Sequence, residues 1–258
     1  MNFLSDLVDK VTIVTGGSQG IGFALARGLA KYGCKIIIFN RKTPKGEAAA
    51  QSIREGGGAA VHITGDVSQK KSIEEMVEKT LRQQGRIDIL VNNAGVNVRK
   101  PAVEVSEEDW DMIFSTNLQG LFLCSQIVGR QMIQQKGGKI VNVASMGSTF
   151  GLVNRAPYCA SKAGVAQLTR ALALEWAKYN VYVNAIAPGI IQTPLTEAYM
   201  QSHPERLGTA LRKLPLGYIG KPENLVGATL FLASTASDYI TGQTLYIDGG
   251  YSLGCLDW

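Results

Sequence analysis

The clearest signal of this chain's fold is one glycine-rich stretch, which reads Thr15-Gly-Gly-Ser-Gln-Gly-Ile-Gly22. The stretch directly follows a β-branched run, Val11–Val14, and it opens an amphipathic helical pattern over Ile21–Tyr32. Glycines at such a strand-to-helix junction permit a tight turn and let a diphosphate group approach backbone N–H groups closely. The helix N-terminus then faces the phosphates with the positive end of its dipole. The stretch therefore predicts a dinucleotide-binding unit at the start of the chain.

Outside this stretch, short β-branched runs alternate with longer helical patterns. Further strands are expected at Lys35–Phe39, Ala60–Thr64, Ile87–Val91, Lys139–Val143, Val181–Ile186 and Thr244–Ile247. Further helices are expected at Lys45–Gly56, Lys70–Gln84, Glu107–Gln135, Pro157–Tyr179 and Pro222–Ser234. Continuous apolar strands that alternate with helices indicate a parallel sheet covered on both faces. We predict a single α/β domain over residues 1–258, a Rossmann-like doubly wound sheet of seven strands, with the irregular residues 190–218 as a substrate-loop region.

Composition limits the kinds of protein that the chain can be. Of its 258 residues, 45% are hydrophobic and 18% are charged, which supports a sizeable core and argues against disorder. The net charge is +5, but the basic residues are scattered, which favours a mildly basic enzyme with anionic ligands over a nucleic-acid-binding protein. Four widely spaced cysteines and only two histidines suggest neither a metal site nor a disulfide framework. The acidic start and the lack of any apolar run near ~20 residues predict a cytoplasmic protein without a membrane span.

Residues at the ends of the second and third strands bear on nucleotide choice. Sites that prefer NAD generally place a carboxylate after the second strand, where it accepts hydrogen bonds from ribose hydroxyls. This chain has uncharged Asn40 and then Arg41, whose planar cation suits a ribose 2′-phosphate, so we predict NADP(H) in preference to NAD(H). Arg41 and Lys42 could instead form an ordinary solvated basic pair. Asp66 and Val67 are expected beside the adenine, although Asp66 could also cap the following helix.

Together with the glycine stretch, several further motifs resemble those of the short-chain dehydrogenases/reductases. They are Asn92-Asn93-Ala94-Gly95, Asn117, Ser145, Tyr158-Cys-Ala-Ser-Lys162, Pro188-Gly189 with Thr193, and Asp248-Gly249-Gly250. Each motif alone is common, but here they occur in order, each at the strand end or helix where the family has it. The resemblance covers essentially the whole chain. It implies a seven-stranded doubly wound sheet, a nicotinamide cofactor, catalysis without a metal, and a homotetramer.

Tyr158 and Lys162 are the expected centre of catalysis. They are four residues apart, so on a helix their side chains share one face. A free phenol, with a pKa of about 10, is a poor base at neutral pH, but a nearby ammonium and an oxidised nicotinamide favour the phenolate. Tyr158 would then act as general acid/base, and Ser145 would hydrogen-bond the substrate oxygen beside it. Taken singly, the Tyr–Lys pair could be an ordinary surface pair and Ser145 a helix cap.

The resemblance assigns roles to other residues. Asn117 is similar to an Asn that bends its helix and holds a water in a proton relay beyond Lys162, which also binds the nicotinamide ribose; alone, Asn117 could be a turn residue. Thr193 and Ile191 resemble contacts to the nicotinamide carboxamide, although Thr193 could be a plain helix cap. Gln19 stands where many NADP-specific relatives carry a basic residue. The expected cofactor contacts are Gly16, Ser18, Gln19, Gly20, Ile21, Gly22, Asn40, Arg41, Asp66, Val67, Asn93, Ala94, Gly95, Tyr158, Lys162, Pro188, Gly189, Ile191 and Thr193.

Two loops, which contain Arg99 and Arg155, flank the catalytic cleft in this family. They look similar to those of gluconate 5-dehydrogenases and of 2-deoxy- or 2-dehydro-3-deoxygluconate dehydrogenases. We therefore expect Arg99 and Arg155 to contact a substrate carboxylate beside Ser145 and Tyr158, although both arginines could equally be solvated. The alternative is a 3-oxoacyl thioester or general ketone reductase. A non-catalytic nucleotide-binding regulator is less expected, because such proteins usually lose the Tyr or the Lys.

Assembly is expected to use two long helices. In relatives, the helices that match Glu107–Gln135 and Pro157–Tyr179 pack across a two-fold axis. Four apolar residues on them could face a second subunit or the sheet: Leu121, Phe122, Leu168 and Leu172. The tail, Tyr251–Trp258, is unusually apolar for a terminus, and we predict that it is buried at a subunit interface bordering a neighbour's active site.

Overall fold

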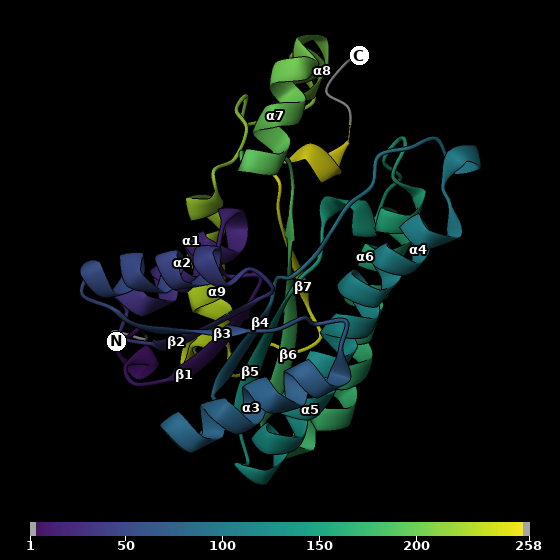
Figure 1. Cartoon of the computed structure of the whole chain (residues 1–258). Coiled ribbons are helices and arrows are strands. Elements are labelled where there is room, and N and C mark those ends of the chain that lie inside the picture. Colours follow the sequence, from purple (N-terminus) through teal and green to yellow (C-terminus); the bar gives the residue numbers. More distant parts are fainter. Residues whose placement is uncertain (1–3, 255–258) are drawn as a thin grey trace.

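The computed structural model describes residues 4–254, apart from several side chains between residues 195 and 207, and its centre is a seven-stranded sheet (Figure 1). The strands are β1 (Val11–Thr15), β2 (Lys35–Asn40), β3 (Ala59–Thr64), β4 (Ile89–Asn92), β5 (Gly138–Val143), β6 (Val181–Pro188) and β7 (Thr244–Ile247). Their order is β3-β2-β1-β4-β5-β6-β7, and all neighbours are parallel. The winding direction reverses between β1 and β4, which opens a crevice at the carboxyl ends of the strands.

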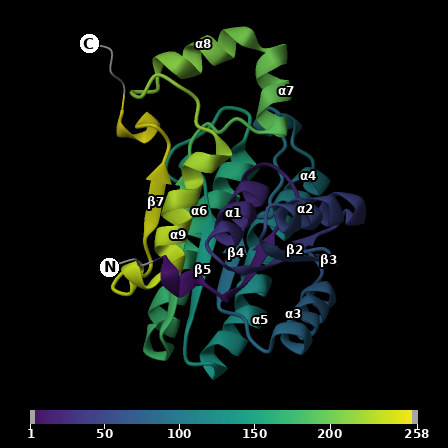
Figure 2. The same ribbon diagram turned by 90° about the vertical axis from the view of Figure 1, so that its left-hand side faces the viewer.

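Helices cover both faces of this sheet (Figures 1 and 2). One face carries α1 (Gly20–Lys31), α2 (Thr43–Glu55) and α9 (Val226–Ala233), and the other carries α3 (Lys70–Gln84), α5 (Gly120–Gln134) and α6 (Ala156–Trp176). Three further helices, α4 (Glu107–Phe114), α7 (Pro194–Ser202) and α8 (Pro204–Arg212), lie toward the carboxyl ends of the strands. The predicted fold class, a doubly wound parallel sheet of seven strands with helices on both faces, is confirmed.

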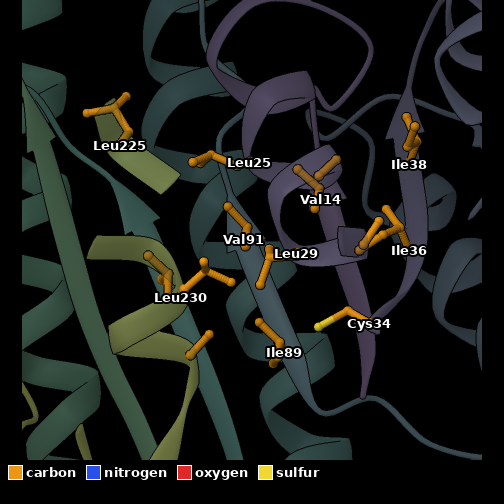
Figure 3. Close-up of a cluster of buried hydrophobic side chains, with 14 of the residues drawn as sticks. Val14, Leu25, Leu29, Cys34, Ile36, Ile38, Ile89, Val91, Leu225 and Leu230 are labelled. Atoms are coloured by element: carbon orange, nitrogen blue, oxygen red, sulfur yellow. The ribbon is translucent and has the colours of Figure 1, made fainter. Parts of the chain in front are cut away.

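The central strands, such as β1, β4 and β5, are buried on both faces and largely apolar, whereas the edge strands β3 and β7 are partly exposed. Ile13 and Val14 are adjacent in β1 and fully buried, yet they belong to two different hydrophobic clusters. Successive strand side chains point to opposite faces, so Val14 packs in the cluster with Leu25 and Leu29 of α1 (Figure 3). Ile13 belongs to the cluster on the α3 and α5 face. The two layers of core hold the carboxyl ends of the strands in fixed positions.

Two segments differ most from the sequence-based expectation. The single helix expected over Glu107–Gln135 is divided into α4, a π-helical turn at Ser115–Gln119, and α5. Such π turns are frequent at functional sites. Residues 190–218, expected to be irregular, contain the short helices α7 and α8. Within the described part of the chain, no helix is both long and apolar enough to cross a membrane.

Candidate active site

A single cleft of about 720 Å³ runs along the carboxyl ends of the strands. It brings together nearly all of the residues that the sequence nominates as cofactor, substrate or catalytic contacts. The cofactor set lines it without exception, and so do Ser145, Arg99 and Arg155. Asn117 is different, because it lies beneath the cleft and does not line it. Residues chosen from seven separate segments therefore meet in one place.

The glycine turn has the shape of a cradle for a diphosphate. Gly16 and Gly20 have positive φ angles of +64° and +55°, which other residues rarely adopt. A Cβ atom on Gly22 would lie 2.4 Å from the carbonyl oxygen of Gly16, so only glycine lets α1 come this close to the turn. A Cβ on Gly20 would project toward Thr193, 3.6 Å away, and would narrow the gap between them. Because Gln19, the residue before α1, makes no side-chain cap, the helix N-terminus keeps donors for a phosphate.

The segment after β4 holds this turn in place. Asn93 donates from Nδ2 to the carbonyl oxygens of Thr15 (3.0 Å) and Gly16 (3.2 Å). The Thr15 hydroxyl oxygen accepts from the backbone N–H groups of Asn93 and Ala94, both at 3.0 Å. Asn92 is buried among polar side chains and donates to Ser125 and Asn142, both at 2.9 Å. The Asn-Asn-Ala-Gly segment thus has a structural role in addition to its place in the cleft.

Ser145, Tyr158 and Lys162 lie together in the cleft, close to the end of β5. Lys162 is buried, and its Nζ donates to the carbonyl oxygen of Val143 at 2.6 Å. The same Nζ lies 5.9 Å from the centre of the Tyr158 ring. Ser145 lies directly before a short 3-10 turn, and its Oγ accepts from the N–H of Gly147 at 3.0 Å. The helix-cap interpretation of Ser145 therefore holds alongside its place beside Tyr158.

Burial is the largest influence on the pKa values of this cluster. It raises the pKa of Tyr158, although a hydrogen bond from Ser145 and the positive charges of Arg155 and Arg99 act in the opposite direction. Burial also lowers the pKa of Lys162 to about 8. The neighbouring groups therefore act in the expected direction, but within the protein alone the net shift of the Tyr158 pKa is upward, because desolvation of the phenolate outweighs them.

Asn117 is hydrogen-bonded to two segments near the cleft, the loop after β4 and the first turns of α6. It lies in the π-helical turn, is fully buried, and accepts from the N–H of Val96 at 2.8 Å. Its Nδ2 donates to the carbonyl oxygen of Val96 (2.9 Å) and to the hydroxyl of Ser161 (3.2 Å). A Cβ on Gly95 would lie 3.3 Å from Asn117 Oδ1 and 3.7 Å from Lys162 Nζ. Asn117 and Lys162 thus approach the same glycine.

The adenosine end of the cleft is richer in charge than the sequence suggests. Arg41 lies with its Nη1 3.7 Å from Oδ2 of Asp66. Asp66 Oδ1 accepts from the backbone N–H and the hydroxyl of Ser68, both at 2.9 Å, so Asp66 also caps the turn that leads into α3. Lys42 and Lys45 line the same end. Sequence reasoning missed Lys45 as a site residue, because it lies inside the helix expected there.

The substrate end is formed by segments far apart in the sequence. The N–H of Lys100 donates to the carbonyl oxygen of Asn154 at 3.1 Å, which ties the loop of Arg99 to the loop of Arg155. Thr193 accepts from the N–H of Thr196 as the cap of α7, which confirms its helix-cap interpretation, and it also lines the cleft. Sequence reasoning missed several further lining residues, for which no local motif gives a signal: Asn97, Leu152, Val153, Met200, Ala210 and Tyr251.

The residues predicted to lie at a subunit interface differ in their exposure. Leu121 and Leu172 are buried against the sheet, and Leu168 packs partly against the same core, whereas Phe122 is exposed. In the tail, Tyr251 stacks on Phe150 with ring centres 5.7 Å apart, and Leu253 is largely exposed. The last residues of the predicted buried tail, 255–258, lie outside the described part of the chain.

Comparisons with known proteins show the family to which the chain belongs. A model of the short-chain dehydrogenase/reductase family, described as enoyl-(acyl carrier protein) reductase, matches residues 16–252. The chain is 40% identical to the 5-keto-D-gluconate 5-reductase of Escherichia coli (strain K12), over 97% of this chain and 98% of that protein. It is 41% identical to a 3-oxoacyl-[acyl-carrier-protein] reductase of Thermotoga maritima, over 95% of this chain and 98% of the relative.

Solved structures point the same way. The structure is similar to that of a gluconate 5-dehydrogenase from Burkholderia cenocepacia J2315 in complex with NADP and tartrate, with a TM-score of 0.93 and 37% identity. The match covers 97% of this chain and 99% of that one. The chain therefore belongs to the short-chain dehydrogenase/reductase family, and it is an NAD(P)-dependent oxidoreductase that acts on CH–OH groups.

Proposed function

We propose that the protein interconverts a secondary hydroxyl and a ketone on a sugar acid, with NADP(H) as the preferred cofactor. The observation that carries this proposal is the position of Arg99 and Arg155. Both line the cleft that contains Ser145 and Tyr158, and the positive charge of each acts on the pKa of Tyr158. A carboxylate on a small polyhydroxy substrate would meet these guanidinium groups while its hydroxyl reaches the phenol.

Four residues would carry the reaction. The nicotinamide supplies or accepts the hydride. Ser145 would hold the substrate oxygen, and the Tyr158 hydroxyl would donate or accept that oxygen's proton. Lys162 would bind the nicotinamide ribose and favour the phenolate by its charge, which must offset the effect of burial on Tyr158. Asn117, tied to Val96 and Ser161, would position the relay that passes the proton from the Lys162 side toward solvent.

The rest of the cleft suits a dinucleotide phosphorylated on its ribose. The glycine turn from Gly16 to Gly22 would hold the diphosphate, and Asn93 braces that turn. At the adenosine end, Asn40 brings no negative charge, and the guanidinium of Arg41 lies at the same edge. These two residues support a preference for NADP(H), because an anionic side chain at position 40 would repel a 2′-phosphate.

Residues 190–218 would form the substrate-binding cap. Met200 and Ala210 from this segment line the cleft, and α7 and α8 stand beyond the carboxyl ends of the strands (Figure 2). Helices placed over a site in this way exclude water when substrate binds. We propose that this segment, rather than the sheet, sets the size of substrate that enters.

We also propose that the protein is a cytoplasmic homotetramer. The exposed apolar side chains of Trp110 and Met112 in α4, and of Phe122 in α5, would face a second subunit. Free thiols at Cys34, Cys124 and Cys159 suit a reducing compartment. Light scattering at micromolar concentration tests the assembly, and a monomer there would contradict it.

A substrate panel tests the proposed reaction against its alternative. The purified protein would be assayed with gluconate-type sugar acids, a 3-oxoacyl thioester and a simple ketone, each with both cofactors. We expect kcat/KM for the best sugar acid to exceed that for the acyl thioester at least tenfold. The similarity to acyl-carrier-protein reductases favours the thioester as the second candidate. A higher kcat/KM for the thioester than for every sugar acid would contradict the sugar-acid proposal and favour a 3-oxoacyl thioester reductase.

A further inference from the structure

A lysine from another helix reaches the glycine turn at the point where the turn lacks a basic residue. Gln19 is neutral, and the turn from Thr15 to Gly22 contains no Lys or Arg. In the structure, Nζ of Lys45 donates to Oε1 of Gln19 at 3.3 Å, although the two residues are 26 positions apart. Both side chains line the adenosine end of the cleft. The turn thus acquires a positive charge that its own sequence does not contain.

We propose that Lys45 binds the 2′-phosphate of NADP(H) from α2 and so replaces the missing basic residue of the glycine turn. This inference rests on the preference for NADP(H) proposed above. Lys45 and Arg41 would then hold the phosphate between the glycine turn and the end of β2. Lys45 is a residue that determines cofactor specificity, and it takes no part in the proton or hydride transfer.

Arg41 by itself is poorly suited to bind the phosphate. Its guanidinium lies 3.7 Å from the Asp66 carboxylate, which attracts the positive charge and repels an incoming phosphate. Lys45 instead donates to a neutral amide oxygen, that of Gln19. A phosphate oxygen would offer Lys45 a stronger, charge-assisted hydrogen bond than the Gln19 amide does. Binding of the phosphate would therefore gain from Lys45 without first breaking an ion pair.

The start of α2 is held where Lys45 can reach the ribose site. The hydroxyls of Thr43 and Thr64 are 2.8 Å apart and join the first turn of α2 to the end of β3. Gly46 is buried, and a Cβ there would lie 2.2 Å from Nε2 of His62 and 2.6 Å from Oδ1 of Asn40. Only glycine permits this close approach of α2 to β2 and β3. The residue next to it, Lys45, is therefore fixed at the backbone beside Asn40, while its ammonium extends to the glycine turn.

Calorimetry with cofactor fragments tests this role without any catalytic step. Adenosine 2′,5′-bisphosphate and adenosine 5′-monophosphate would be titrated into the wild type and into Lys45→Met. Lys79→Met, at an exposed position of α3, is the control with the same change of charge. We expect Lys45→Met to bind the bisphosphate about tenfold more weakly and the monophosphate unchanged, and the control to bind both as the wild type does. Gln19→Arg in the Lys45→Met background should restore most of the loss.

Three results would overturn the inference. Equal weakening of both fragments by Lys45→Met would mean that Lys45 supports the adenosine pocket rather than the phosphate. A wild type that prefers the bisphosphate, with Lys45→Met unchanged, would assign the phosphate to Arg41 and leave the NADP(H) preference intact. A wild type that binds both fragments equally would overturn the NADP(H) preference itself, and the role of Lys45 with it.

Discussion

The two ends of the cleft differ in how far their polar and charged side chains are exposed to solvent. At the catalytic end, Ser145, Lys162 and Asn117 are 6%, 4% and 0% exposed, and burial dominates the pKa values of Lys162 and Tyr158. At the adenosine end, the side chains of Arg41 and Asp66 are 61% and 30% exposed. Buried charges are costly and sensitive to position, whereas exposed charges are screened by water and salt. Substitutions should therefore have large effects on chemistry at one end and small effects on cofactor choice at the other.

The largest effect is expected from Tyr158→Phe. In the proposed mechanism the phenol hydroxyl exchanges the alcohol proton, so its removal should lower kcat about a thousandfold. Nucleotide affinity, measured by fluorescence quenching, should change less than about twofold, since no charge is lost. Tyr239→Phe removes a hydroxyl from a fully exposed ring and serves as the control. Turnover near that of the wild type in Tyr158→Phe would rule out the proposed acid/base.

Lys162→Met should separate activity from stability. Loss of the ammonium should lower kcat about a hundredfold and weaken nucleotide binding. The folded protein without nucleotide should nevertheless become more stable at pH 7, by up to about 3 kcal/mol, because a buried charge is replaced by an apolar side chain. Urea unfolding of both proteins measures this difference, with Lys79→Met as the control, which should unfold as the wild type does.

The lowered pKa of Lys162 makes the difference in unfolding free energy between Lys162→Met and the wild type depend on pH. Between about pH 8 and the ordinary value of 10.5, the unfolded chain binds a proton that the folded protein does not. Stability contributed by this residue therefore rises with pH across this window, and below pH 8 the cost is present in full. The gap in unfolding free energy between Lys162→Met and the wild type should shrink from pH 8 to pH 10. A gap that is constant with pH would show that Lys162 is not desolvated as the structure indicates.

Arg155→Gln tests the substrate end of the cleft, where we expect an effect of intermediate size. If Arg155 pairs with a substrate carboxylate, KM for a sugar acid should rise about tenfold while kcat changes little. KM for an alditol of the same length, which has no carboxylate, should stay close to that of the wild type. Equal changes in KM for both substrates would show that Arg155 does not bind a substrate carboxylate.

The smallest effect is expected from Arg41→Ala. Its guanidinium is exposed and partly engaged by Asp66, so NADP(H) binding should weaken only about fivefold, with NAD(H) nearly unaffected. Raising the salt from about 0.05 M to 0.5 M should reduce the NADP(H) affinity of the wild type and narrow this gap, because exposed charges are screened. Equal losses for both cofactors would contradict a contact between Arg41 and the 2′-phosphate.

The sequence by itself determined the sheet and the contents of the cleft. β-branched runs such as Val11–Val14 can be recognised in the sequence because both faces of the strand are buried. The glycine turn after this run can be recognised because its backbone needs glycine. Parallel strands bring their carboxyl ends to one edge, so motifs that follow separate strands had to meet there. This is why motifs that resemble those of the family, such as Ser145 and Asn93, could be expected to lie in one cleft.

Only the tertiary structure decided which charges act together and how strongly. The contact between Lys45 and Gln19, and the lining of the cleft by Tyr251, join residues that no local pattern connects. The direction of the pKa shift of Tyr158 also could not be read from its spacing to Lys162. Spacing on a helix shows which side chains share a face, whereas the pKa depends on how much water the whole fold removes from them.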